Sequence, residues 1–225
     1  MKPVVASLAI SMFMAGSASA SPITAYEVQS VFDGNQAYGG ILGMLFEVNE
    51  TVTVLSLGAF DDDGDGIAGT LTTELWSRTG TVGDSILAAM TFTANDYGTL
   101  EGGSRFKDLV GPLVLTPGSY AIVSYGYSAT DENGNRSSPN WMGSLATNDG
   151  NGALSFVRGG RYGGTPGTGI GTTYDPEVLG HGDPYAAGTF TYEVGLTPSV
   201  PLPVSLPLLA GGVALIGAFG GRRKS

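Results

Sequence analysis

The stretch Thr51-Val-Thr-Val-Leu-Ser-Leu57 sets the fold class of this chain. It is rich in β-branched and apolar residues and is followed by Gly58, which predicts a strand that ends there. A second stretch, Thr189-Phe-Thr-Tyr-Glu-Val194, alternates apolar and polar residues with the period of two that a half-buried strand requires. Both patterns predict β-strands.

The rest of the central chain has the same character. Five more segments are predicted as strands: 26–32, 41–48, 71–76, 86–93 and 119–125. No sustained helical periodicity occurs before residue 204, and the 37 glycines far exceed the usual share of about 7%. The segment 131–188 is the least regular. We therefore predict an all-β chain with one jelly-roll-like β-sandwich over residues 21–197.

The N-terminus has the pattern of a signal peptide. Lys2 is the only charge among the first 20 residues, and an apolar run follows it over 4–14. Ala18-Ser19-Ala20 then matches a small-x-small cleavage site, which predicts cutting by signal peptidase between Ala20 and Ser21. An uncleaved anchor is the alternative, but the apolar run is shorter than the ~20 residues that span a bilayer.

Charge and cysteine content exclude several classes of function. All 20 acidic residues lie between the two terminal segments but only 6 of the 10 basic ones do, so this part has a formal charge of −14. Such a surface repels nucleic acid, which we exclude as a partner. The chain has no cysteine, which excludes thiol nucleophiles and Cys/His zinc sites.

The C-terminal 28 residues form a separate unit in the sequence. A proline-rich linker begins at residue 198, and an uncharged, mostly apolar segment over 204–221 is predicted as a transmembrane helix. Arg222, Arg223 and Lys224 follow it and would hold its end on the cytoplasmic side.

Val200, Pro201, Leu202 and Pro203, followed by the apolar segment and the basic cluster, resemble the VPLPA variant of the PEP-CTERM sorting signals. Proteins with these tails are exported by Gram-negative bacteria, often ones that make exopolysaccharide. The resemblance implies recognition by an exosortase, a membrane transpeptidase that cuts near the proline motif. Val204 departs from the pattern, which usually has alanine there. A plain C-terminal membrane anchor is the alternative interpretation.

Asp61, Asp63 and Asp65 are the candidate metal ligands. They alternate and Gly66 follows, as at the start of a calcium loop in which carboxylates converge on one hard cation. The twelfth loop position, where an EF-hand has glutamate, is Thr72. Two interpretations stay open: a loop calcium site with a distant further ligand, and a solvated acidic turn between strands.

Other candidate sites are weaker. Trp141 lies in a polar loop and is a candidate for stacking on a sugar ring, whereas Trp76 lies on a predicted strand and is expected to pack in the core. His181 is the only histidine, and the chain has no Gly-x-Ser-x-Gly motif of a serine hydrolase. A carboxylate pair for glycoside hydrolysis would not be marked in sequence.

These patterns predict an exported protein of the cell envelope or extracellular matrix that is sorted by an exosortase and has no evident catalytic activity. The first alternative is a carbohydrate-binding β-sandwich associated with exopolysaccharide. The second is a membrane-anchored hydrolase. Calcium is the one cofactor that the sequence suggests.

Overall fold

The computed structural model describes residues 21–29, 33–80, 82–135, 144–163, 165–166, 173–174 and 185–195. Every regular element in these residues is a β-strand, which confirms the all-β prediction. In chain order the strands are β1 (Ile23–Thr24), β2 (Tyr26–Gln29), β3 (Ile41–Val48), β4 (Val52–Phe60), β5 (Thr70–Thr79), β6 (Val82–Thr93), β7 (Thr99–Glu101), β8 (Ser104–Leu115), β9 (Gly118–Tyr125), β10 (Gly134–Asn135), β11 (Ser144–Thr147), β12 (Leu154–Tyr162), β13 (Thr173–Tyr174), β14 (Tyr185–Ala186) and β15 (Gly188–Val194).

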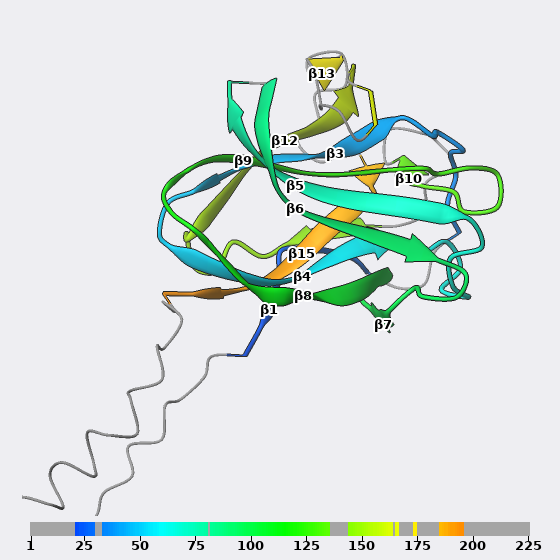
Figure 1. Ribbon diagram of the computed structural model, residues 1–225, viewed down its shortest axis with the longest axis horizontal. Coiled ribbons are helices and arrows are strands. Elements are labelled where there is room, and N and C mark those ends of the chain that lie inside the picture. The colour runs from blue at the N-terminus through cyan, green and yellow to red at the C-terminus, as the bar shows by residue number, and fades with distance from the viewer. Residues whose placement is uncertain are drawn as a thin grey trace, which may run out of the picture.

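Most strands belong to two antiparallel sheets, which lie one above the other in Figure 1. The lower sheet has five strands in the order β1-β15-β4-β8-β7, and the upper sheet has six in the order β13-β12-β3-β9-β5-β6. The pairs β2–β11 and β10–β14 are separate two-stranded ladders. Strands β15 and β4 pair although more than a hundred residues separate them. The lower sheet therefore forms only when segments from the early and late parts of the chain come together.

Apolar side chains from both sheets form one shared core. Phe46 on β3 and Phe190 on β15 come from different sheets, and their ring centroids lie 5.0 Å apart. Both side chains are fully buried, and the alternation of a strand turns every second residue toward the same face. The buried members of this core are Ala25, Tyr26, Met44, Phe46, Val48, Val52, Val54, Leu57, Leu75, Leu115, Tyr120, Ile122, Ala153, Leu154, Phe190 and Tyr192.

Strand β3 is buried on both of its faces. Met44 and Phe46 belong to the shared core, whereas Ile41 and Leu45 belong to a smaller cluster with Trp76. The two sets occupy alternate positions, so the smaller cluster lies on the opposite face of the six-stranded sheet. Trp76 is 5% exposed, which confirms that this tryptophan is a packing residue.

The structure moves one predicted strand end and adds two long strands that the sequence did not predict. Strand β4 does not end at Gly58 but continues to Phe60, because its ladder with β8 continues through the pairs of Ala59 with Arg105 and Phe60 with Ser104. Strand β8 is not predicted by the sequence, since Gly111 and Pro112 interrupt its pattern. Strand β12 lies within the segment predicted to be irregular, and it pairs with β3 around a bulge between Phe156 and Arg158.

Several predicted features lie outside the described residues. These are the signal peptide with Ala18 and Ala20, the sorting residues Val200, Pro201, Leu202, Pro203, Arg222, Arg223 and Lys224, the apolar segment 204–221, Trp141 and His181. Ser21, the first residue after the predicted cleavage, is described and exposed. Within the described ranges, no helix is long and apolar enough to cross a membrane.

Candidate functional site

The acidic stretch predicted as a calcium loop forms the turn between β4 and β5. Asp63 has a φ of 62°, in the left-handed region, and Gly64 and Gly66 follow with φ of 72° and 112°. Aspartate and glycine adopt such angles more readily than other residues, so the sequence suits this turn for backbone reasons alone.

Asp61 is used inside the protein. Its residue is 2% exposed, and its carboxylate lies 2.5 Å from Nε of Arg105 on β8. The backbone N–H of Gly66 donates to it at 3.2 Å. Burial raises the pKa of Asp61 above its usual value, and the hydrogen bond and charge of Arg105 oppose that rise.

Arg105 closes the turn from the other side. Its Nη2 donates to the carbonyl of Gly64 at 2.8 Å, and its guanidinium lies 4.7 Å from the ring centroid of Tyr97. One side chain thus joins the acidic turn, β8 and an aromatic ring. Arg105 could not be identified from the sequence, since 44 residues separate it from Asp61.

Two further carboxylates hold backbone amides of neighbouring loops. Asp131 is 3% exposed and accepts hydrogen bonds from the backbone N–H groups of Ala68, at 2.7 Å, and Gly69, at 2.8 Å. Asp62 accepts from the backbone N–H groups of Gly34 and Glu132. These contacts tie the turn to segments far away in the chain, and carboxylates satisfied in this way are structural.

Asp63 and Asp65 are exposed instead. A hydrogen bond with Asp33 and the charge of Asp62 raise the pKa of Asp63 to about 6. The three predicted ligands are therefore divided, since Asp61 faces Arg105 and Asp63 faces Asp33. Among the residues that the structure describes, no group of three or more histidine or acidic side chains is arranged to hold a metal ion, and calcium binding stays a prediction.

A buried polar cluster lies on the outer face of the six-stranded sheet. The carboxylate of Glu74 accepts hydrogen bonds from Nε1 of Trp76 and from the hydroxyl of Tyr125, each at 2.9 Å. Burial and this contact raise the pKa of Tyr125 to about 12. Arg78 forms an ion pair with Glu47 on the adjacent part of the sheet. Each of these groups is satisfied by another, which gives the cluster a structural role.

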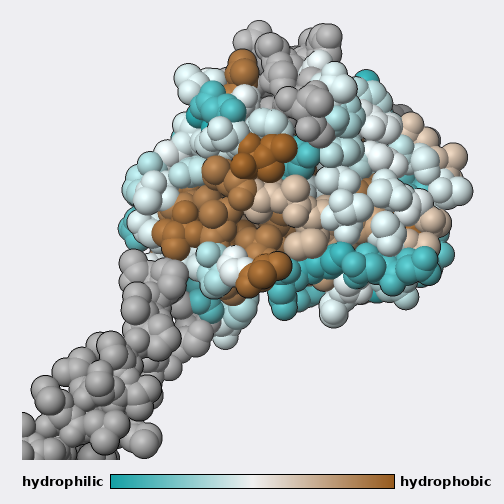
Figure 2. All heavy atoms as spheres, in the orientation of Figure 1, coloured by the Kyte–Doolittle hydropathy of each residue, from teal (hydrophilic) through white to brown (hydrophobic). Residues whose placement is uncertain are grey.

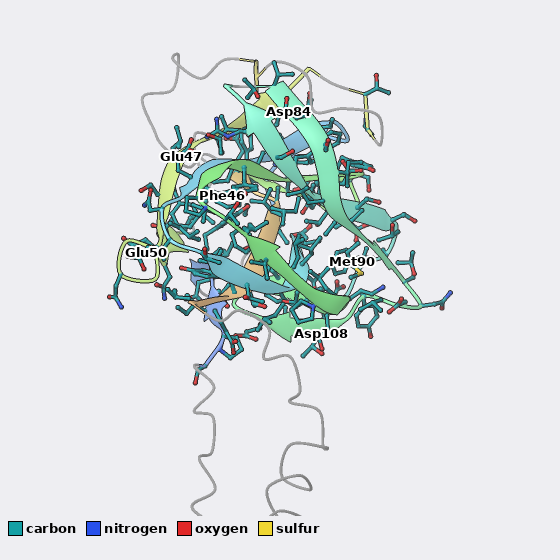
Figure 3. All side chains as sticks on the ribbon, turned by 60° about the vertical axis from the view of Figure 1, so that its left-hand side comes forward. Phe46, Glu47, Glu50, Asp84, Met90 and Asp108 are labelled. Carbon is teal, nitrogen blue, oxygen red and sulfur yellow. The ribbon has the colours of Figure 1, made fainter. Side chains whose placement is uncertain are left out.

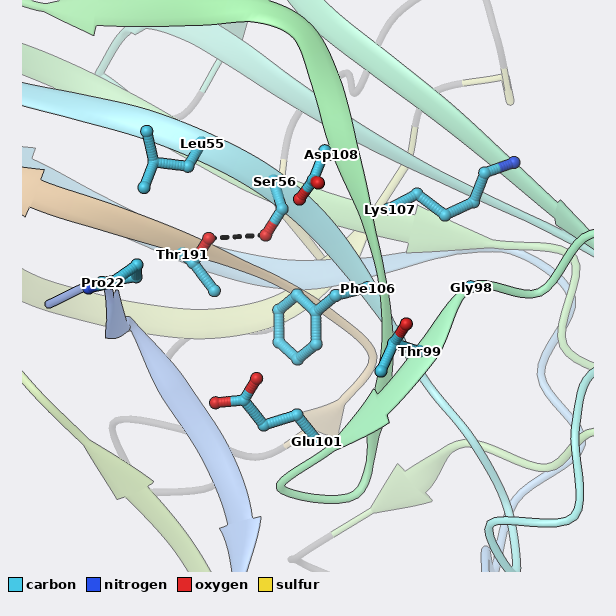
Figure 4. A pocket seen from close by; sticks show the side chains of 10 residues that line it. All are labelled: Pro22, Leu55, Ser56, Gly98, Thr99, Glu101, Phe106, Lys107, Asp108 and Thr191. Atoms are coloured by element: carbon cyan, nitrogen blue, oxygen red, sulfur yellow. Dashed lines mark hydrogen bonds between the residues drawn. The ribbon is translucent and has the colours of Figure 1, made fainter.

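A cavity of about 480 Å³ opens on the five-stranded sheet, on the face turned away from the shared core. Figure 4 shows the side chains that line it. Two rows of cross-strand neighbours contribute to its lining: Thr191, Ser56 and Asp108 in one row, and Phe106 and Thr99 in the next. Pro22, Leu55, Gly98, Glu101 and Lys107 complete the lining. This site is not visible in the sequence, because its residues come from four strands and the N-terminal segment.

The surface also carries an apolar area over β6 and β8, which Figure 2 shows in brown where these strands face the viewer in Figure 1. Ile86 and Leu87 on β6 are 41% and 37% exposed, and Val110 on β8 is fully exposed. Val110 lies where β8 bulges away from β4, between the pairs of Ser56 with Asp108 and Val54 with Leu113.

Strand β6 is the last strand of its sheet. Sheet edges are usually protected by lysine, proline or several charges, but Asp84 is the only charged residue among the twelve of β6. Figure 3 shows Asp84 near one end of this strand. The edge is closed at one point, where Nζ of Lys107 donates to the carbonyl of Thr91 at 2.9 Å.

The chain matches no protein-family model, and a search of curated proteins finds no relative. The interpretation of its sites therefore depends on their geometry.

Proposed function

We propose that the protein is an exported component of the cell envelope or extracellular matrix, sorted by an exosortase and without catalytic activity. The observation that carries the proposal is the order of three parts over 200–225: a Val-Pro-Leu-Pro motif, an apolar segment and a basic cluster. Signal peptidase and the exosortase would process the two ends. The chain would be held in the membrane, transiently or permanently, by the helix 204–221.

The ectodomain in this proposal is one jelly-roll-like β-sandwich. Two antiparallel sheets that share a core support this architecture. Their largest shared side chains come from strands far apart in the chain, so the domain would fold as one unit rather than as independent halves.

The surface supports a protein that works through contact with other molecules. Most buried charges of the acidic turn and of the Glu74 cluster are satisfied by structural partners. The exposed apolar area over β6 and β8 is a feature typical of interaction surfaces. An unprotected edge strand can also add a strand from another chain.

Carbohydrate binding is the second candidate function. Its predicted platform residue, Trp141, lies outside the described residues, but the lined cavity on the five-stranded sheet favours this candidate independently. A concave site with apolar surface and a few polar groups is the usual form of a small-ligand site.

The intact mass of the protein recovered from its native envelope tests the sorting proposal. We expect a mature N-terminus at Ser21 and a C-terminus within 200–204, with or without an attached group. A mass that still includes Arg222 to Ser225 would mean that the tail is a plain membrane anchor, and the exosortase would be removed from the proposal. A mass that includes residues 1–20 would contradict cleavage by signal peptidase.

A further inference from the structure

The cavity on the five-stranded sheet has two carboxylates that form no side-chain interaction with the part of the chain that the structure describes. Glu101 on β7 and Asp108 on β8 line it, and both are exposed. Neither has a hydrogen-bond or ionic partner among the described residues. Both therefore remain available to accept hydrogen bonds from a ligand.

Among the described residues that line the cavity, Lys107 is the only one with a cationic side chain. Lys107 contributes its aliphatic stem, but its ammonium group turns away (Figure 4). That group lies 2.5 Å from the carboxylate of Asp96 and 2.9 Å from the carbonyl of Thr91. An anionic ligand would meet two carboxylates and no free cationic side chain, which disfavours this class.

The spacing of the two carboxylates argues against a single cation as well. Glu101 pairs with Ser104, and Asp108 lies four residues further along β8. Four residues of strand extend ~13 Å, at about 3.3 Å per residue. In Figure 4 the two carboxylates lie on either side of the Phe106 ring. This backbone separation favours a ligand with several separated donors over a single ammonium or metal ion that contacts both carboxylates.

The remaining polar groups both donate and accept. The hydroxyls of Ser56 and Thr191 lie 2.5 Å apart, and their residues are 3% and 8% exposed. A pair of hydroxyls uses only one of its two hydrogens, so one hydrogen stays available at the cavity. Thr99 adds an exposed hydroxyl at the opposite rim.

An aromatic ring forms the apolar centre of the cavity. Phe106 lies against Gly58, where a Cβ would come within 2.6 Å of its Cε1 atom. Its position is therefore fixed by the backbone of β4. Phe106 is 8% exposed, and the small part of the ring that stays accessible faces the cavity together with Pro22 and Leu55. An aromatic surface of this kind contacts the C–H groups of a ligand.

We propose that this cavity binds a neutral, hydroxyl-rich ligand, one or two sugar units of a glycan. The ring hydroxyls would donate to Glu101 and Asp108 and exchange hydrogen bonds with the Ser56–Thr191 pair, while C–H groups of the sugar contact the accessible part of Phe106. The volume of about 480 Å³ lies within the usual range for small-ligand sites. The site uses none of the residues of the sorting tail, and it gives the carbohydrate-binding candidate a location apart from Trp141.

Saturation-transfer NMR on the purified protein tests the proposal, with glucose, mannose, cellobiose and lactose as probes and spermidine as a cationic probe. We expect transfer to at least one sugar with affinity of about millimolar order, little changed by added salt. Amide shifts in a ¹⁵N-labelled sample should centre on Thr99, Phe106 and Asp108. Transfer to spermidine alone, or to no probe, would overturn the proposal.

Three variants make the test specific. The double variant Glu101→Gln/Asp108→Asn should weaken sugar binding by about tenfold, since charged acceptors form stronger hydrogen bonds than amides. Thr99→Trp fills the rim at an exposed position and should remove binding. Glu50→Gln changes an exposed carboxylate far from the cavity and should bind as the parent does (Figure 3). Unchanged sugar binding in Thr99→Trp, with a native amide spectrum, would place the sugar elsewhere and overturn the assignment. This outcome does not depend on the result of the envelope mass measurement.

Discussion

The acidic turn contains aspartates of two kinds, although their sequence neighbours are nearly the same. Asp61 is buried against Arg105 and the amide of Gly66, whereas Asp63, two residues later, is exposed beside Asp33. Burial raises the pKa of Asp61 while Arg105 lowers it, and only other carboxylates act on Asp63 apart from a small effect of burial. The first aspartate is therefore part of the architecture, and the second is a surplus negative charge at the surface.

The difference shows that a pattern of alternating carboxylates does not determine which of them is available to bind a cation. Alternation places side chains in space only after the turn is folded, and an arginine from a different strand can then neutralise one of them. Variants that remove the buried partner of Asp61, or that neutralise each aspartate in turn, test whether the two aspartates differ in this way.

Removing Arg105 should have the largest effect. Arg105→Met leaves the buried carboxylate of Asp61 without a cation, which costs about 3–5 kcal/mol in the free energy of unfolding. The loss should be largest near neutral pH and shrink in acid, because a protonated Asp61 needs no partner. Urea denaturation at pH 7 and pH 5 measures both effects.

The double variant Arg105→Met/Asp61→Asn is the control for that prediction. It removes both charges and should recover most of the stability that Arg105→Met loses. If the double variant is as unstable as the single one, the loss comes from packing of Arg105 on Tyr97 rather than from the ion pair.

Asp131→Asn should have a smaller effect, about 1–3 kcal/mol of destabilisation. An amide oxygen is a weaker acceptor than a carboxylate, and the two N–H groups of Ala68 and Gly69 point at both oxygens of Asp131. Asp84→Asn is the matched control at an exposed site and should stay close to the parent. Equal midpoints for both variants in thermal unfolding would mean that the loop hydrogen bonds do not contribute measurably.

Calcium, if it binds this turn, should raise the melting temperature by a few degrees, because a ligand that binds only the native state stabilises that state by mass action. In a domain of this size, ~1 kcal/mol in the free energy of unfolding corresponds to roughly 2–4 °C. Chelation should reverse the rise, and Asp63→Asn should reduce it. Asparagine is the suitable replacement because residue 63 has a φ of 62°, which asparagine tolerates better than alanine. Identical melting curves with calcium and with chelator would leave the turn a solvated loop.

The smallest effect concerns pH. In calcium-free buffer the folded pKa of Asp63 is about 6, above the usual 3.8, so its folded state binds the proton more tightly than the unfolded state does. Its contribution to stability is present below about pH 4 and is lost as pH rises through about 6. Asp63→Asn should remove this loss of stability. If the unfolding midpoint declines equally in the parent protein and the variant from pH 4 to 7, the loss comes from other titrating groups.

Each strand that was predicted from the sequence has a local pattern strong enough to identify it without knowledge of the strand it pairs with. Strand β3 was predicted with its observed bounds, and β4, β5, β6, β9 and β15 within a few residues. Strand β8 has charges, a glycine and a proline in its pattern and bulges away from β4 between Asp108 and Leu113. Its pairing with β4 on either side of the bulge holds it in place. Local pattern cannot show such a pairing.

The candidate sites were less predictable than the strands. The acidic turn was visible as a run of residues, but the division between Asp61 and Asp63 depends on Arg105 and Asp33 from other segments. The cavity was not visible at all, because Ser56, Thr191 and Asp108 become neighbours only through the register of β15, β4 and β8.

The sequence by itself determined the all-β class, most strands of the core and the acidic turn, because strand alternation and turn preferences are properties of a few consecutive residues. Only the tertiary structure decided which aspartate is neutralised and which hydroxyls and carboxylates share a cavity. Those outcomes depend on contacts between strands far apart in the chain, whose register is set by the burial of a common core.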